Sequence, residues 1–71
     1  MKKDKKRIFA ANLKAERNRK FLSQEELAEK ANLSSQTVSK LERGVQTPTL
    51  YTALDIANAL EIDINELLKG L

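Results

Sequence analysis

The segment that decides the fold runs from Ser23 to Gly44 and reads SQEELAEKANLSSQTVSKLERG. It holds two short amphipathic stretches, each opened by a serine, Ser23 or Ser34, of the kind that caps a helix. Glu26 follows Ser23 at the three-residue spacing of a capping box. Asn32 is expected to end the first stretch, because asparagine tolerates the left-handed conformation that many helix ends require. The segment therefore predicts two short helices joined by a tight turn.

Helical periodicity continues on both sides of this segment, and alternating runs of β-branched residues are absent. We expect one helix to start after Asp4, a fair N-cap, and to run to about Lys20. Another helix is expected to follow a cap at Thr49 or Thr47.

A fifth helix is expected to begin at Asp63, with Glu66 completing a second capping box, and to stop at Gly70. The residues expected to face the core are Phe9, Ala10, Leu13, Leu27, Ala28, Ala31, Val38, Leu41, Leu50, Leu54, Ala57 and Leu60. Five short helices with short connections predict an all-α fold, a compact five-helix bundle. We place this domain at residues 7–71 and a basic N-terminal arm at residues 1–6.

Composition narrows the classes of function. The chain has 71 residues, enough for one small domain, and it contains neither cysteine nor histidine. That removes disulfides, the usual zinc ligands and thiol or imidazole catalysis. No apolar run approaches the length of a membrane span, so we expect a cytoplasmic domain without membrane contact. We expect no cofactor, no metal and no small-molecule ligand.

Charge is distributed unevenly along the chain. Residues 1–20 carry nine Lys or Arg and two Asp or Glu, a balance of +7, whereas residues 21–71 carry four and eight, a balance of −4. This asymmetry favours a polyanionic partner at the basic end. The alternative is a solvated tail that only aids solubility.

Several short elements occur in a characteristic order along the chain. They are Leu22-Ser23-Gln24-Glu25, Leu27-Ala28, Val38-Ser39, Leu41-Glu42-Arg43-Gly44, Pro48 and Asn65-Glu66-Leu67-Leu68. At these spacings, over roughly residues 7–69, the chain resembles the Cro/phage-repressor, or XRE-type, helix-turn-helix DNA-binding family. The resemblance implies a lambda-repressor-like domain with a central helix-turn-helix. It also implies a sequence-specific transcriptional regulator of double-stranded DNA, most simply a dimeric repressor of a palindromic operator.

Two residues depart from the family pattern. Where the family often has glycine between the second and third helices, this chain has Asn32, which suits the same turn. Where the family often has glycine after the first helix, this chain has Phe21. A bulky residue at positive φ would be strained, so we expect the first helix to end with a different cap and Phe21 to pack inward.

The resemblance implies that the third helix, at about residues 34–43, lies in the major groove. The candidates for reading bases are Ser35, Gln36, Thr37, Ser39 and Lys40. Glutamine can bind adenine N6 and N7 together, and lysine can donate to guanine O6 or N7. The alternative is an ordinary solvated face. However, residues 34–40 include no acidic side chain, so this face can approach phosphates without repulsion.

The candidates for phosphate binding are Ser23, Gln24, Arg17, Arg43 and Thr47. Gln24 opens the second helix, where N–H groups point outward and the helix dipole is positive. Arg17 also matches a family arginine that pairs with the glutamate at Glu42, and the resemblance implies that this pair braces the first helix against the third. The alternative is two unrelated surface charges. The arm could reach a minor groove, or it could be a tail with only diffuse attraction for DNA.

A dimer would place two copies on half-sites about 34 Å apart. The candidates for its interface are Ile64, Leu67, Leu68 and Leu71, because they supply more apolar surface than one short helix easily buries. The alternative is that Ile64 and Leu67 belong to the core and that the domain is a monomer.

Two other classes of function, an enzyme and a protein-interaction module, fit the sequence less well than a DNA-binding regulator does. No nucleophile–base pair, metal-ligand cluster or phosphate-binding glycine loop is present, so we expect no enzyme. A protein-interaction module of the same fold, such as an antitoxin or a transcriptional coactivator, is the remaining alternative. The negative balance of residues 21–71 would suit a basic partner.

Overall fold

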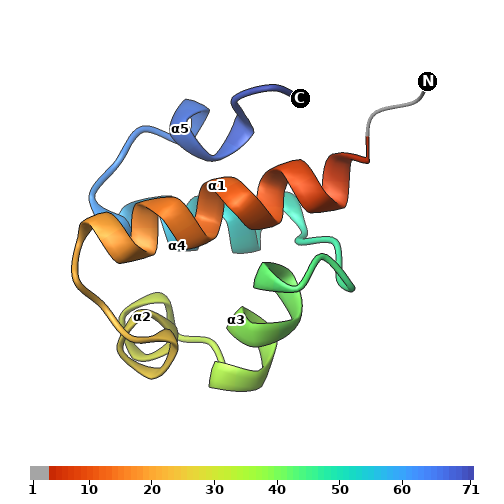
Figure 1. Ribbon diagram of the computed structural model, residues 1–71. Coiled ribbons are helices and arrows are strands. Elements are labelled where there is room, and N and C mark those ends of the chain that lie inside the picture. Colours follow the sequence, from red (N-terminus) through yellow and green to blue (C-terminus); the bar gives the residue numbers. More distant parts are fainter. Residues whose placement is uncertain (1–3) are drawn as a thin grey trace.

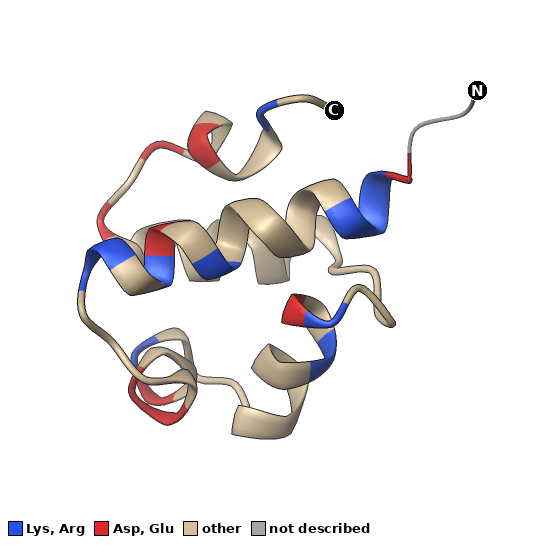
Figure 2. Cartoon of the chain, in the orientation of Figure 1, with Lys and Arg blue, Asp and Glu red and all other residues tan. Residues whose placement is uncertain are grey.

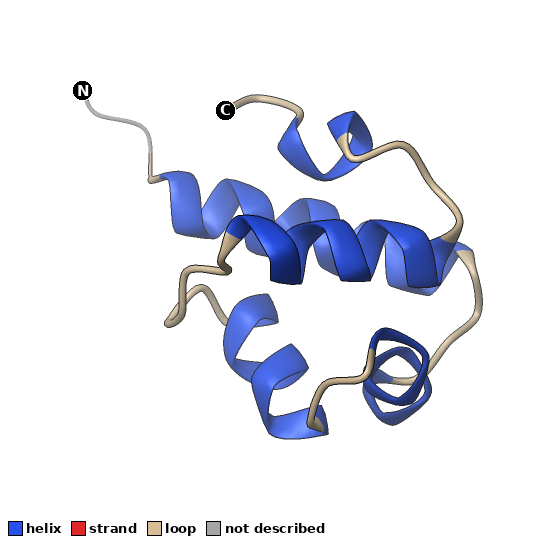
Figure 3. Cartoon of the chain, turned by 180° about the vertical axis from the view of Figure 1, so that it is seen from behind, coloured by secondary structure: helices blue, strands red, loops and turns tan. Residues whose placement is uncertain are grey.

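The computed structural model describes residues 4–71, which form five α-helices and no strand. The helices are α1 (Lys5–Arg19), α2 (Gln24–Ala31), α3 (Ser35–Glu42), α4 (Leu50–Leu60) and α5 (Asn65–Leu68). In Figure 1, α1 crosses the middle of the molecule, with α5 on one side and with α2 and α3 on the other. α4 lies behind α1 in that view and in front of it in Figure 3. The predicted all-α five-helix bundle is confirmed.

α1 begins where the sequence predicts. Asp4 is extended (φ −87°, ψ 94°), and its Oδ1 accepts a hydrogen bond from the backbone N of Arg7 at 3.2 Å. Lys5 and Lys6, which we had assigned to the arm, are the first two residues of α1. The remaining arm residues, 1–3, lie outside the described part of the chain.

The first four helices end in the same way. The first or second residue after each helix is left-handed, and the N–H of the residue that follows it donates to the carbonyl five positions back, as in a Schellman motif. The left-handed residues are Phe21 (φ 59°), Asn32 (φ 58°), Gly44 (φ 73°) and Glu61 (φ 56°). The closing N···O distances are 3.2 Å for Leu22 to Arg17, 2.8 Å for Leu33 to Ala28, 3.2 Å for Val45 to Lys40 and 3.0 Å for Ile62 to Ala57. These motifs explain how the connections reverse the chain over so few residues.

Phe21 corrects the prediction for the end of α1. The expected inward packing is wrong, because Phe21 is left-handed and 92% exposed. The Schellman hydrogen bonds require the left-handed conformation at this position whatever the side chain. Leu22, the next residue, packs against the core instead. Phe21 therefore retains a backbone strain of about 1–2 kcal/mol that a glycine would not have.

Residues of all five helices form one core. Its buried members are Phe9, Leu13, Leu27, Ala28, Ala31, Val38, Leu41, Ala53, Ile56, Ala57, Leu60 and Leu67. The prediction was wrong for part of α4, where Leu50 and Leu54 are 69% and 37% exposed. The α4 sequence carries two apolar stripes with helical spacing, so periodicity does not choose between them. The stripe that includes Ala53 and Ala57 faces inward, where small side chains allow close packing of helices.

α5 is shorter than predicted and begins differently. It starts at Asn65, and Ile64 at the N-cap position makes no side-chain capping bond. The expected capping box of Asp63 and Glu66 is wrong, because Asp63 Oδ1 accepts from the N of Asn65 at 2.8 Å, as in an Asx turn. Asn12 of α1 holds the far end of α5. Its Nδ2 donates to the backbone carbonyls of Leu67 and Lys69, each at 2.9 Å.

Candidate nucleic-acid interface

Ser23 and Glu26 build the first turn of α2. Ser23 Oγ accepts from Glu26 N at 3.0 Å, and Ser23 N donates to Glu26 Oε1 at 2.9 Å, which is the predicted capping box. The backbone N–H and then the hydroxyl of Ser23 lower the pKa of the Glu26 carboxyl. The N–H groups of Gln24 and Glu25 have no acceptor within the helix, as is usual in a first turn. They remain available to an anion from outside.

The exposed face of α3 contains the predicted base-reading residues. Ser35, Gln36 and Lys40 are exposed, whereas Thr37 and Ser39 are half-buried. The Thr37 hydroxyl lies 2.8 Å from that of Ser34, the N-cap residue, so Thr37 is less available than predicted. Figure 2 shows acidic colour on α3 only at its C-terminal end, where Glu42 lies. From Ser35 to Lys40, α3 therefore presents hydroxyl, amide and ammonium groups without a carboxylate.

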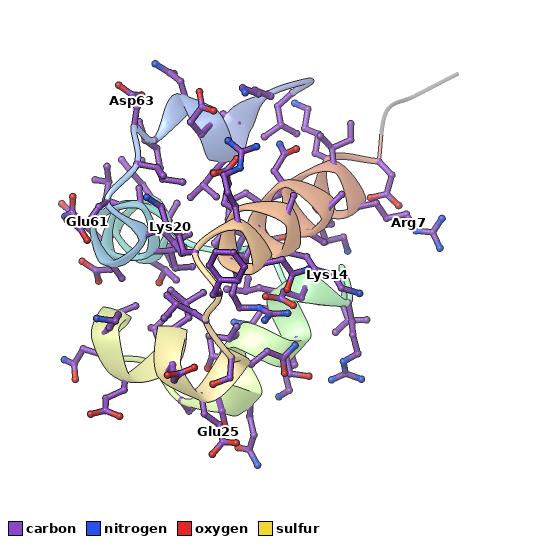
Figure 4. The ribbon with its side chains drawn as sticks, turned by 60° about the vertical axis from the view of Figure 1, so that its left-hand side comes forward. Arg7, Lys14, Lys20, Glu25, Glu61 and Asp63 are labelled. Atoms are coloured by element: carbon purple, nitrogen blue, oxygen red, sulfur yellow. The ribbon has the colours of Figure 1, made fainter. Side chains whose placement is uncertain are left out.

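A hollow of about 440 Å³ lies between the start of α2 and the exposed face of α3. The residues around it are Arg17, Ser23, Gln24, Glu25, Ser35, Gln36 and Ser39. Figure 4 shows Glu25 projecting away from the body of the molecule. The hollow thus combines predicted phosphate-binding residues on α2 with predicted base-reading residues on α3.

Arg17 and Glu42 form a bidentate ion pair beneath this hollow. Arg17 Nε lies 2.6 Å from Glu42 Oε2, and Arg17 Nη2 lies 3.0 Å from Glu42 Oε1. The side chains are only 12% and 3% exposed, and the hydrogen bond to Glu42 raises the pKa of Arg17. Arg17 Nη1 also donates to the carbonyl of Leu22 at 2.7 Å. The pair joins α1 to α3, and these contacts use three of the five guanidinium N–H groups of Arg17.

Sequence reasoning missed a contact between Gln24 and Glu42. Gln24 Nε2 donates to Glu42 Oε1 at 3.1 Å, which ties α2 to the Arg17–Glu42 pair. Nothing in the sequence indicates this contact, because it depends on how closely α2 and α3 approach. The first helix, the second helix and the third helix therefore meet at one carboxylate.

The two remaining phosphate-binding candidates lie outside the hollow. Arg43 is the exposed C-cap residue of α3, and Thr47 is exposed in the connection to α4. Thr47 borders a second depression, of about 380 Å³ and largely apolar. The residues around this depression are Lys5, Lys6, Phe9, Thr47, Pro48, Leu68 and Leu71.

The structure divides the residues predicted for a dimer interface. Leu67 is fully buried, and Ile64 is half-buried and packs against the core. Leu68 and Leu71 are 40% and 41% exposed. The outer face of α4 also exposes apolar side chains, which were not among the predicted interface residues. The large apolar residues exposed there are Leu50, Tyr51 and Leu54.

Most charged residues of α1 are basic, whereas those of the α4–α5 connection are acidic. Arg7, Lys14 and Lys20 are distributed along α1 and just beyond its end, and Glu61 and Asp63 lie between α4 and α5 (Figure 4). Over residues 4–71, no helix combines the length and apolar character of a membrane span, and no cluster of acidic side chains is arranged to hold a metal ion.

Residues 13–67 match a family model described as helix-turn-helix. Among curated proteins, the chain is 38% identical over 65 residues to the control protein C.SmaI of Serratia marcescens, covering 92% of this chain and 77% of that protein. It is 33% identical over 63 residues to the HTH-type transcriptional regulator YqaE of Bacillus subtilis. That match covers 89% of this chain and 54% of YqaE, so the chain spans about half the length of YqaE.

The fold also matches solved structures. The restriction-modification controller protein C.AhdI of Aeromonas hydrophila superposes with a TM-score of 0.85 at 37% identity. The match covers 87% of this chain and 94% of C.AhdI.

Proposed function

The chain belongs to the helix-turn-helix family of DNA-binding transcriptional regulators, and we propose that it reads a palindromic operator as a homodimer with α3 in the major groove. One observation carries this proposal. The acid-free face of α3 and the open N–H groups at the start of α2 border the same hollow. Such an arrangement lets one element contact bases while the other binds the adjacent phosphate.

Base reading falls to the exposed residues of α3. Gln36 has the amide that can bind adenine N6 and N7, and Lys40 can donate to guanine O6 or N7. The Ser35 hydroxyl can hydrogen-bond to several different bases. Thr37 and Ser39 are half-buried and contribute less, through the parts of their side chains that remain exposed. Each bidentate contact discriminates between bases by about 1–3 kcal/mol.

Backbone contacts supply most of the affinity. The N–H groups of Gln24 and Glu25, with the Gln24 amide and the Ser23 hydroxyl, bind one phosphate. Arg43 and Thr47 bind the backbone at the other end of α3. Arg17 acts through Glu42 as a brace rather than as a phosphate ligand, because its guanidinium already has three acceptor contacts in the protein.

Assembly as a dimer would use the surface at Leu68 and Leu71, together with the outer face of α4. Large apolar side chains that are exposed on a protein surface are typical of interfaces. A two-fold dimer gives half-sites about 34 Å apart. In the simplest form of this function, the dimer represses transcription in the cytoplasm. The likeness to the control protein C.SmaI and to the restriction-modification controller protein C.AhdI supports a role in controlling transcription.

The test is a selection of bound duplexes from a random pool. We expect a palindromic sequence with two half-sites about one helical turn apart. Gln36→Ala with Lys40→Ala should abolish the sequence preference, while Asn58→Ala, which removes an exposed amide of α4, should leave it unchanged. Log affinity should fall linearly with log salt. A protein-interaction module would show neither a selected sequence nor this salt dependence.

A further inference from the structure

The Glu42 carboxylate accepts hydrogen bonds from Arg17 of α1 and from Gln24 of α2. Its Oε1 accepts from Arg17 Nη2 at 3.0 Å and from Gln24 Nε2 at 3.1 Å. Its side chain is only 3% exposed, so Glu42 does not itself offer a surface to DNA. Gln24, by contrast, is half-buried and borders the hollow between α2 and α3. The carboxylate therefore touches, from beneath, a side chain that faces the proposed phosphate.

An ionised carboxylate accepts hydrogen bonds and donates none. The side of the Gln24 amide that faces Glu42 must therefore be its nitrogen, and this fixes which way the amide is turned. The same NH₂ group carries a second hydrogen, which the bond to Glu42 leaves unused. The backbone N–H groups of Gln24 and Glu25 stand beside it in the first turn of α2.

We infer that Glu42 is a positioning residue for DNA binding, which holds the Gln24 amide so that its second N–H joins the first-turn N–H groups of α2 around one phosphate. The inference rests on the proposed DNA-binding function. A glutamine side chain that is mobile on the protein surface loses conformational entropy when it contacts a phosphate, and this loss weakens DNA binding. A glutamine already held by Glu42 avoids much of that loss. Arg17 contributes indirectly, because its two hydrogen bonds hold the Glu42 carboxylate in place.

The test compares the effect of Gln24→Ala in two backgrounds, the natural chain and the double variant Arg17→Met/Glu42→Met. The double variant replaces a buried ion pair by apolar side chains of similar length, a change that is often tolerated. The ligand is a 30-base-pair duplex of arbitrary sequence at low salt, because a phosphate contact does not require an operator.

In the natural chain we expect Gln24→Ala to weaken binding about tenfold, and in the double variant by no more than about twofold. The slope of log affinity against log salt should stay unchanged, because the contact is neutral on the protein side. Asn58→Ala is the matched control and should change nothing in either background. An equal loss from Gln24→Ala in both backgrounds would overturn the positioning role and leave DNA binding intact. A natural chain that binds no duplex would instead overturn the proposed function.

A second measurement does not depend on the folding of the double variant. The side-chain NH₂ of Gln24 can be followed by NMR relaxation in the natural chain without DNA. We expect an order parameter close to that of rigid backbone, about 0.8, against less than about 0.6 for Asn58. A Gln24 amide as mobile as that of Asn58 would show that Glu42 does not hold it.

Discussion

Arg17 and Leu22 are joined twice, once in each direction. The backbone N of Leu22 donates to the carbonyl of Arg17 at 3.2 Å, and Arg17 Nη1 donates to the carbonyl of Leu22 at 2.7 Å. The first bond closes the Schellman motif and the second anchors the guanidinium that pairs with Glu42. The conformation of Phe21, which lies within this loop, is therefore tied to the ion pair beneath the DNA-binding surface.

Phe21→Gly should stabilise the domain. Glycine removes the left-handed strain, and part of that gain is offset by the greater freedom of glycine in the unfolded chain. The expected gain is about 0.5–1 kcal/mol in the free energy of unfolding, which raises Tm by a few degrees. Thermal unfolding checks this. Phe21→Ala is the control, since alanine keeps the strain; a gain of the same size with alanine would show that exposure of the aromatic ring, rather than φ, is responsible.

Arg17→Met alone should destabilise the domain by about 3–5 kcal/mol, because it leaves the Glu42 carboxylate buried without its cation. Arg17→Met/Glu42→Met should recover much of this loss, because it leaves no unpaired charge. Urea unfolding measures both. If the double variant were less stable than the single variant, the pair would contribute through its three-helix geometry rather than through charge compensation.

Acid should weaken the start of α2 through Glu26. Its pKa is lowered in the folded state, so its contribution to stability is present above the ordinary value of 4.5 and is lost as pH falls through the folded value. Glu26→Gln should therefore lower Tm at pH 7, and the difference from the natural chain should shrink below about pH 4. Thermal unfolding at several pH values shows this. A difference independent of pH would contradict the role of the ionised carboxylate.

Substitutions at Leu67 and Leu68 should distinguish the stability of the monomer from the assembly of the dimer. Leu67→Ala removes a fully buried side chain and should lower the free energy of unfolding by about 2–5 kcal/mol. Leu68→Lys changes a partly exposed side chain and should leave Tm of the monomer nearly unchanged while it weakens the dimer. Sedimentation over a range of concentrations, with operator binding measured in parallel, distinguishes the two. Normal assembly of Leu68→Lys would place the interface elsewhere.

Local signals in the sequence predicted much of this fold. Ser23 and Glu26 form their box because the helix starts beside them, and Asn32 adopts the left-handed conformation that its side chain tolerates. Asp63 and Glu66 have the same spacing without the same result. The Asp63 side chain instead bonds the N of Asn65, two residues on, and makes a local turn.

The error for Phe21 is also local, because the Schellman hydrogen bonds determine its backbone conformation, whereas three other features depend on contacts between distant residues. Which stripe of α4 faces inward depends on where the other helices pack, and the inward position of Leu67 depends on α1. The bond between Gln24 and Glu42 spans 18 residues. For the candidate interface, the sequence indicated most of the residues that border the hollow, but not that the Glu42 carboxylate contacts both Arg17 and Gln24.

Asn12 Nδ2 donates to the carbonyls of Leu67 and Lys69, each at 2.9 Å, and so fastens α5 to α1. The same helix carries Arg17 near its C-terminal end, where Arg17 pairs with Glu42 beneath the hollow between α2 and α3. If two copies assemble through Leu68 as proposed, α1 would contact both the segment that carries this interface and, through Arg17 and Glu42, the helix proposed to read the operator.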